Sequence, residues 1–476
     1  MFCSDASEWA ESVFGQAELG DERRTSRLVR LASLMAENPA LSVDAACGGD
    51  SAEAEGAHRF VRNGHVGVDA VFNAGAKSVA QTAVEVSGDL LALEDSTTLS
   101  YPHSVAQKLG DTGGKKGAKK DKGGWWVHSV VLVSAQSHVP IGPIYQKRWC
   151  RPHGQRGKKR QRRSRAYEHK ESFKWEEASR EVRRRLGSAS MDRVIAVCDR
   201  EADVFEYLTY KISNKQRFVV RASWDRNVCV AKNGKKCHLW DVMKAAPVRK
   251  RISVTVPQKG GRKERTAELS LRFRQVTLAK PNFKRTTVEK PLDVGVVFVR
   301  EDNPPEKVEP LEWMLLTIEP IRNAKQAVEV LEHYKTRWMI EDWHKAWKTG
   351  CAVEKRRQQD VPNLERVVVI TEFIAIRLLQ LRALANERAE DSCEELLGDA
   401  EWKCLWLSVE KKALPKKTPK IGWAYRSIGR LGGWKDSKRD GKVGWQLLYR
   451  GWVRLQDRTE GYRLAVAQLA HGEVIK

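Results

Sequence analysis

The amino-acid sequence predicts an α/β protein in which a β-rich centre is flanked by helical regions. Near the N-terminus and after about residue 323, apolar residues recur at the three- and four-residue spacing of amphipathic helices. Between these regions, runs of β-branched and aromatic residues alternate with polar ones or continue without interruption, as strands do. A chain of 476 residues can form two to four domains with a sizeable core.

Residues 1–70 predict a small helical module. Asp21 is expected to cap one helix, with an apolar stripe from Leu28 to Met35, and Ser51 a second helix that ends at Gly64. Four arginines lie at the front of the first helix: Arg23, Arg24, Arg27 and Arg30. Arginines near a helix start suit contacts with DNA phosphates, but a solvated helix face would have the same composition.

The middle of the chain predicts strands separated by two helices. Strands are expected at 90–100, 125–135 and 140–149, then a helix at about 172–186, a strand from 194 and a helix from about 203. Residues 217–319 are β-rich, and the chain is largely helical from 323 onward, including a Trp- and charge-rich region at 385–476. No run of about 18 apolar residues predicts a transmembrane helix, and no secretory signal is found, so a cytoplasmic protein is expected.

The charge of the chain points to a polyanionic partner. Lys and Arg number 85 against 61 Asp and Glu, a formal charge of +24, which favours nucleic acid first and an anionic membrane second. The run 147–165 holds ten Lys or Arg in 19 residues. It predicts a disordered basic loop, a phosphate clamp, or a loop that orders on DNA.

Two aspartates follow apolar runs at predicted strand ends: Asp95 ends one strand and Asp199 another. Carboxylates that converge from separate elements suit magnesium, which prefers oxygen ligands and can serve phosphoryl transfer in pairs about 3.5–4 Å apart. Taken singly, an aspartate at a strand end is more often a turn or cap residue.

A third acid lies on the predicted helix at 333–350, which Gly350 is expected to end. On a helical wheel, Glu341 and four cationic or aromatic residues fall within about 60° of Tyr334. These residues are Arg337, Trp338, Lys345 and Lys348. An acid surrounded by phosphate-binding cations suits metal-dependent phosphoryl transfer, and a structural ion-pair helix remains the alternative.

The spacing of Tyr334, Arg337, Glu341 and Lys348 matches the signature of the insertion-sequence-four family of bacterial DDE transposases without a gap. Further segments resemble the family in the same order: 19–29, 55–63, 92–101, 124–130, 194–203, 217–221, 313–317, 342–350, 377–382 and 429–439. The resemblance covers nearly the whole chain. It implies a nucleoid-associated bacterial enzyme for cut-and-paste DNA transposition.

For the fold, the resemblance implies an RNase H-like catalytic domain at 71–384, interrupted by a β-rich insertion at about 217–319. Residues 1–70 would bind the transposon end, and helices at 385–476 would pair two subunits in a homodimeric synaptic complex. The catalytic residues would be Asp95, Asp199 and Glu341, which bind two Mg²⁺ ions that Mn²⁺ can replace. The reaction would nick the terminal inverted repeat, form and open a DNA hairpin, and join the 3′-hydroxyl to target DNA.

The same resemblance implies DNA-binding roles for ten residues. Tyr334, Arg337 and Lys348 would hold phosphates near the cleaved end, with Lys345 and Arg221 nearby. Trp313 would receive a flipped base and Trp338 would fill its place, although the residues alone favour Trp313 as a strand core residue. Arg24, Arg27 and Arg59 would contact the transposon end.

The basic run 147–165 has no counterpart in the family pattern, and we expect it to add contacts that do not depend on DNA sequence. Two other classes of function compete with the transposase. One is a non-catalytic DNA-binding regulator of transposition, and the other is a nuclease or junction resolvase on the same fold. The complete set of three acids argues against the first, and the tryptophan pair against the second.

Overall fold

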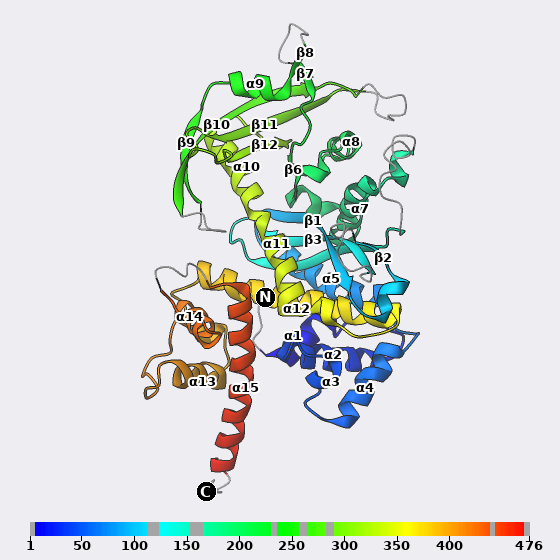
Figure 1. Cartoon of the computed structure of the whole chain (residues 1–476), viewed down its shortest axis with the longest axis vertical. Coiled ribbons are helices and arrows are strands. Elements are labelled where there is room, and N and C mark those ends of the chain that lie inside the picture. Colours follow the sequence, from blue (N-terminus) through cyan, green and yellow to red (C-terminus); the bar gives the residue numbers. More distant parts are fainter. Residues whose placement is uncertain are drawn as a thin grey trace.

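The computed structural model describes residues 5–112, 123–152, 165–229, 236–256, 264–281, 290–437 and 443–470. Figure 1 shows a β-rich part at one end of a long molecule, a layered α/β part in the middle, and helices at the other end. The predicted fold class is confirmed at this level: a mixed α/β protein with helical N- and C-terminal regions.

One mixed sheet of twelve strands runs through the molecule in the order β2-β3-β1-β5-β6-β12-β11-β10-β7-β8, with β4 paired to β3 and β9 to β10. Among the described strands, β1, β5 and β6 pair in parallel, and the other pairs are antiparallel. The strand bounds are β1 Leu90–Tyr101, β2 Gly110–Asp111, β3 Gly123–Ser134, β4 Pro140–Trp149, β5 Val194–Cys198, β6 Arg217–Arg221, β7 Asn227–Cys229, β8 Lys236–His238, β9 Lys250–Val256, β10 Arg265–Leu278, β11 Leu292–Glu301 and β12 Glu312–Thr317.

The burial of the strands follows their sequence patterns. All five residues of β5 are buried, as expected for a parallel strand covered on both faces, whereas β9 alternates exposed and half-buried residues. The strands within 217–319 continue the same sheet as β1 and β5. The β-rich region therefore extends the central sheet, because its strand β6 pairs with β5 on one side and with β12 on the other.

Five helices precede the sheet: α1 Ala6–Phe14, α2 Glu22–Glu37, α3 Val43–Ala46, α4 Ser51–Arg62 and α5 Val68–Glu85. Asp21 caps α2 as predicted, since its side chain accepts from the Arg23 amide. The predicted cap at Ser51 is wrong by one residue. Asp50 caps α4 by accepting from the amides of Ala52 and Glu53, because the carboxylate precedes the first helical residue.

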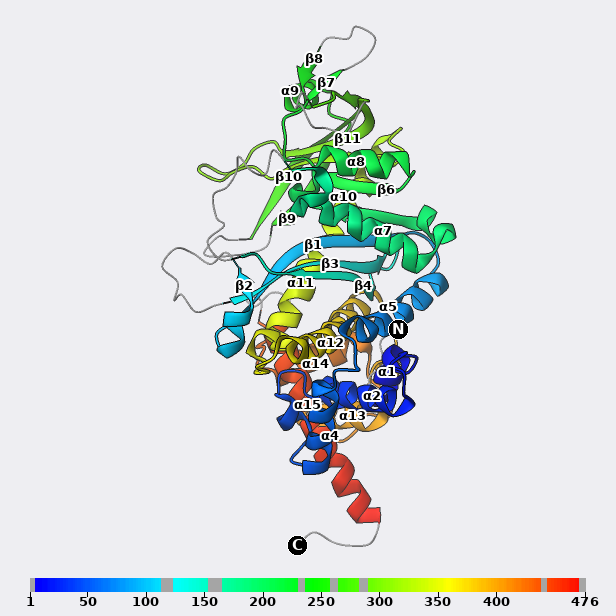
Figure 2. The ribbon, with the colours of Figure 1, turned by 90° about the vertical axis from the view of Figure 1, so that its right-hand side faces the viewer.

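Helices cover both faces of the sheet. Figure 2 shows α7 (Lys174–Leu186) on one side of β1 and β3, and α11 and α12 on the other. The remaining bounds are α8 Phe205–Ser213, α9 Leu239–Ala245, α10 Ala324–Thr336, α11 Trp338–Lys345 and α12 Val361–Glu387. Most of α12 is buried, and its Arg366 donates to the carbonyls of Val61 and Val66, which ties the N-terminal module to α12.

The C-terminal region consists of α13 Asp399–Val409, α14 Ile421–Leu431 and α15 Trp445–Ala470, which pack around a core that they share with the end of α12. Figure 1 shows α15 projecting past its neighbours toward the C-terminus. Within the described part of the chain, no helix combines the length and apolar character needed to cross a membrane.

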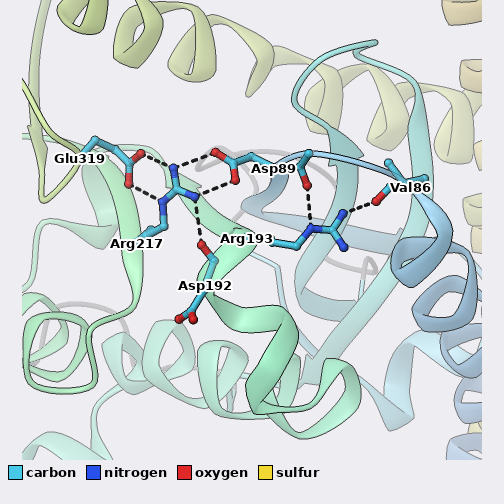
Figure 3. Close-up of polar contacts among 7 residues, drawn as sticks. Val86, Asp89, Asp192, Arg193, Arg217 and Glu319 are labelled. Carbon is cyan, nitrogen blue, oxygen red and sulfur yellow. Dashed lines mark hydrogen bonds and ion pairs between the residues drawn. The ribbon is translucent and has the colours of Figure 1, made fainter.

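A cluster of charges binds the strands together at the edge where β1, β5 and β6 begin, and Figure 3 shows its contacts. Arg217 makes bidentate contacts with Asp89 and Glu319 at 2.6–2.8 Å and donates to the Asp192 carbonyl at 3.0 Å. We call Asp89, Asp192, Arg217 and Glu319 the strand-start cluster. Its hydrogen bonds to the carboxylates hold the pKa of Arg217 above the usual value.

Candidate active site

Two of the predicted acids lie side by side at the opposite end of the parallel strands. The last parallel pair between β1 and β5 is Glu94 with Cys198, so Asp95 and Asp199 are the next residues on adjacent strands. The expectation that Asp95 ends its strand is wrong, because β1 continues to Tyr101 through pairing with β3. Asp199 does follow the end of β5.

The third acid comes from the helix beneath the sheet. Glu341 lies in the first turn of α11 and accepts from Arg337 Nη2 at 2.7 Å. The same nitrogen lies 3.9 Å from Asp199 Oδ2, and the Tyr334 hydroxyl donates to Asp199 Oδ1 at 3.1 Å. Arg337 thus joins two of the three predicted acids, and its own side chain is only 4% exposed.

Two groups from α11 and the turn after it face β1. His344 Nδ1 lies 3.7 Å from Asp95 Oδ2, and Lys348 Nζ donates to Thr97 Oγ1 at 2.7 Å. Asp95 is largely buried, which raises its pKa to about 6 while the positive charge of Arg337 acts in the opposite direction. We call Asp95, Asp199, Tyr334, Arg337 and Glu341 the acid cluster.

The helix is not the regular one that the wheel assumed. It is interrupted at Arg337, between α10 and α11, and its last turn, Ala346–Gly350, is a wider π turn. Lys345 is 58% exposed and pairs with Asp342, while His344 takes the inward position. Trp338 is 52% exposed, and Arg337 Cζ lies 5.6 Å from its ring.

Two further predicted residues come from neighbouring strands. Arg221, at the end of β6, has Nη1 3.9 Å from Asp199 Oδ1 and donates from Nη2 to the Glu312 carbonyl at 3.0 Å. Trp313 on β12 is half-buried, packs against the main core and pairs with Val299 on β11. The structure therefore places Arg221 at the acid cluster and gives Trp313 core contacts.

The N-terminal arginines are separate from the acid cluster. Arg24 donates to the Leu19 carbonyl at 2.8 Å, and Arg27 lies 3.5 Å from Glu53. Arg59 on α4 is 76% exposed and lies 3.5 Å from Glu55. These contacts hold the three guanidinium groups on α2 and α4, with Arg59 the most accessible to a partner.

Residues 153–164 of the basic run lie outside the described residues. At its described start, Lys147, Arg148 and Arg151 each pair with an acid: Glu177, Glu365 and Glu171. The Arg151 guanidinium also lies 3.5 Å from the centre of the Trp126 ring. These three cations are therefore neutralised within the protein.

Sequence reasoning missed His344, Thr97 and Asp203. Alternation along β1 puts Thr97 on the same face as Asp95, so the sequence did contain a signal for it. His344 lies three residues after Glu341 on the same face of α11, so helical periodicity contained a signal for it as well. Asp203, which is fully buried, closes the 3₁₀ turn Arg200–Ala202 that follows Asp199.

The chemistry of the three acids fits magnesium, since each is a partly exposed carboxylate with oxygen atoms available. Their spacing fits less well. Within the described ranges, no group of three or more His, Cys, Asp and Glu side chains is arranged to hold a metal ion. Arg337 would have to move before Asp199 and Glu341 could share one ion.

The N-terminal module is similar to a known protein family. Residues 6–66 match the family model described as transposase DNA-binding. The match spans α1 to α4, which carry Arg24, Arg27 and Arg59. It supports a transposase role, a DNA partner and a DNA-processing enzyme in general terms.

Proposed function

We propose that this chain is a metal-dependent DDE transposase of the insertion-sequence-four family, resembling the Tn-five transposase. The observation that carries the proposal is the acid cluster, where carboxylates from β1, β5 and α11 meet beside a tyrosine and two arginines. Cations aimed at acids are the environment that phosphoryl transfer needs, because negative charge accumulates on the transferred phosphate. The transposase DNA-binding match at 6–66 supplies the class of substrate.

In this proposal, residues 71–384 form an RNase H-like catalytic domain, with the β-rich insertion at about 217–319. Residues 1–70 bind the transposon end, and residues 385–476 form the dimerisation domain. The parallel strands β1 and β5 with acids at adjacent positions favour such a core, because α/β sheets place chemistry at the carboxyl ends of parallel strands.

Asp95, Asp199 and Glu341 would hold two Mg²⁺ ions, or Mn²⁺ in their place. When bound, these ions would activate the attacking oxygen and stabilise the leaving one. Tyr334, Arg337 and Lys348 would fix phosphates of the cleaved strand, and Arg221 and Lys345 would add contacts at its edge. Arg337 would exchange its contacts with Asp199 and Glu341 for a phosphate, which keeps its charge paired throughout.

The same residues would serve four successive displacements at phosphorus. Water nicks one strand, the freed 3′-hydroxyl attacks the opposite strand to form a hairpin, water opens the hairpin, and the 3′-hydroxyl attacks target DNA. A hairpin requires a base to leave the stack. Trp313 would receive this base and Trp338, half exposed beside Arg337, would occupy the gap.

A second copy of the chain would complete the complex. The end of α15 exposes Leu464, Val466 and Leu469, with 64%, 47% and 64% of each residue accessible. Exposed apolar side chains on a projecting helix favour association between copies, since burying them removes apolar surface from water. Each subunit would hold one transposon end through Arg24, Arg27 and Arg59 and cut the end held by its partner.

The test is excision from a plasmid that carries the element between its native ends. We expect hairpin-ended fragments with Mg²⁺ for the wild type and none for Glu341→Ala, which should still bind the end fragment. Binding without cleavage by the wild type would favour the non-catalytic regulator, and cleavage without hairpins a nuclease. Lys403→Ala, in a surface ion pair with Asp399 on α13, serves as the matched control.

A further inference from the structure

Trp224 is a large apolar side chain left in water at a well-anchored position. It lies in the loop between β6 and β7, and 64% of it is exposed. Among the described residues, Trp224 and Trp338 are the tryptophans with more than half of their surface exposed. An indole that contributes so little to the core is available for contact with a partner.

The backbone around Trp224 is held from both sides. Asp203, whose side chain is fully buried, accepts from the amides of Ser223 at 2.8 Å and Trp224 at 3.0 Å, and pairs with Arg226 at 2.6 Å. On the other side, Asp225 accepts from the Trp240 amide at 3.0 Å. The indole therefore projects from a fixed main chain, and little backbone freedom would be lost when a ligand binds.

The anchors place this loop beside the acid cluster. Asp203 closes the turn that follows Asp199, so the residue that holds Trp224 is four positions from a predicted catalytic acid. The loop begins directly after Arg221, which approaches Asp199. The Ala222 amide donates to the Met314 carbonyl at 2.7 Å, next to Trp313 on β12.

We propose that Trp224 is a stacking platform for an unpaired base of DNA at the edge of the acid cluster. Every base has an aromatic face, so an exposed indole binds unstacked bases without regard to sequence. Arg221, directly before the loop, brings positive charge to its Asp199 side, which suits a phosphodiester chain, whereas the charge of Arg226 is neutralised by Asp203. The inference rests on the proposed function only in that DNA must reach this edge.

The experiment measures binding without cleavage. Full-length protein carrying Glu341→Gln is titrated in EDTA against two fluorescent probes, a blunt duplex of about 20 base pairs and the same duplex with a 3′ single-stranded extension of about five nucleotides, roughly the site size of a small single-strand-binding surface. We expect tighter binding of the extended probe. Trp224→Ala should weaken binding of that probe by about 5- to 150-fold, the range for loss of one base–aromatic stack, and leave the blunt duplex unchanged.

Matched variants separate base stacking from general apolar contact. Trp224→Phe should keep most of the preference, Trp224→Leu should lose it despite its apolar surface, and Val84→Ala, at another exposed position on α5, should behave as wild type. The proposal is overturned if the parent protein with Glu341→Gln alone shows no preference for the extended probe, if adding Trp224→Ala keeps the preference, or if Trp224→Ala weakens binding of both probes equally. If Trp224→Ala changed the oligomeric state of the protein in solution, the indole would instead be assigned to contact between copies of the chain.

These outcomes are independent of the transposition assay. If excision failed but the protein still preferred the extended probe through Trp224, the proposed transposase function would be wrong and the DNA-binding surface at Trp224 would still stand. Excision with no effect of Trp224→Ala on the extended probe would remove the base platform alone. Photo-crosslinking through 5-iodouracil in the extension adds a direct readout, because the crosslinked peptide should contain Trp224.

Discussion

The two ends of the parallel strands each carry an arginine between two carboxylates, but the two arrangements differ in how fully the charges are satisfied. In the strand-start cluster, all three guanidinium nitrogens of Arg217 donate to Asp89, Glu319 or the Asp192 carbonyl at hydrogen-bond distance. In the acid cluster, Arg337 donates to Glu341 at 2.7 Å, lies 3.9 Å from Asp199, and has a buried Nε without a partner among the described residues.

The difference separates a structural cluster from a functional one. Buried polar groups in folded proteins are nearly always paired, so an unpaired nitrogen among acids marks a place where a ligand can complete the bonding. Every guanidinium nitrogen of Arg217 already donates to an acceptor in the protein. Its cluster therefore serves only to hold β1, β6 and the end of β12 together. Within the described part of the chain, Arg337 has an unpaired Nε beside partly exposed acids. A phosphate could therefore bind its guanidinium, and a metal ion could take its place at the acids.

The largest expected contrast is in catalysis. Asp199→Asn removes a proposed metal ligand and should lower plasmid excision by at least about 100-fold, as loss of one transition-state contact does. Asp89→Asn makes the same chemical change at the other end, where Glu319 still pairs with Arg217, and should retain nearly full activity. Equal losses in both variants would contradict the division between the two ends.

Stability should show the reverse contrast. Arg217→Ala leaves Asp89 and Glu319 facing each other and should lower the free energy of unfolding by about 2–3 kcal/mol, less than for a fully buried pair because Asp89 is 36% exposed. Arg337→Ala should cost less, since Asp199 and Glu341 are 35% and 29% exposed and can be hydrated. Urea titration followed by circular dichroism measures both, and a greater loss for Arg337→Ala would reverse the assignment.

Metal affinity gives a finer contrast. Arg337 competes with a divalent ion for Asp199 and Glu341, so Arg337→Ala should bind Mn²⁺ without DNA at least about ten-fold more tightly, because one unit charge about 4 Å away near a protein surface is worth up to about 4 kcal/mol. Lys345→Ala, one exposed cation nearby, should change the affinity little. Isothermal titration calorimetry measures these affinities, and weaker Mn²⁺ binding by Arg337→Ala would show that the guanidinium organises the acids instead of competing for them.

The sequence predicted the elements better than it predicted the geometry between them. The buried strand at β5 and the capped helix α2 follow from local patterns, which apolar periodicity and a side-chain cap determine directly. The wheel grouped Lys345 with the inward residues, but Lys345 is exposed and His344, three residues after Glu341, faces the sheet, because a wheel does not show which edge of a polar face packs inward. Arg217 forms hydrogen bonds with Asp89, which is 128 positions away in the sequence, and with Glu319, which is 102 positions away. No local sequence pattern could therefore have indicated this cluster.

The smallest expected effect tests the strand-start cluster by pH. His333 on α10 lies buried near Glu319, Glu329, Arg217 and Asp89, and burial lowers its pKa, with Glu319 acting in the opposite direction. The fold therefore favours neutral His333. Its contribution to stability is complete above the usual pKa of 6.5 and is lost as the pH falls below that value, because the unfolded chain takes up the proton first.

His333→Gln should consequently lose less stability than wild type as the pH falls from about 7 to about 5, the range in which an unperturbed histidine titrates, whatever its stability at the upper end. His65→Gln, at an exposed position, is the control for replacing a histidine with glutamine. Urea midpoints across this pH range measure the difference. A His333→Gln curve parallel to wild type would mean that the cluster accommodates a charged imidazole, and that the strand-start end of the sheet is more adaptable than its complete hydrogen bonding implies.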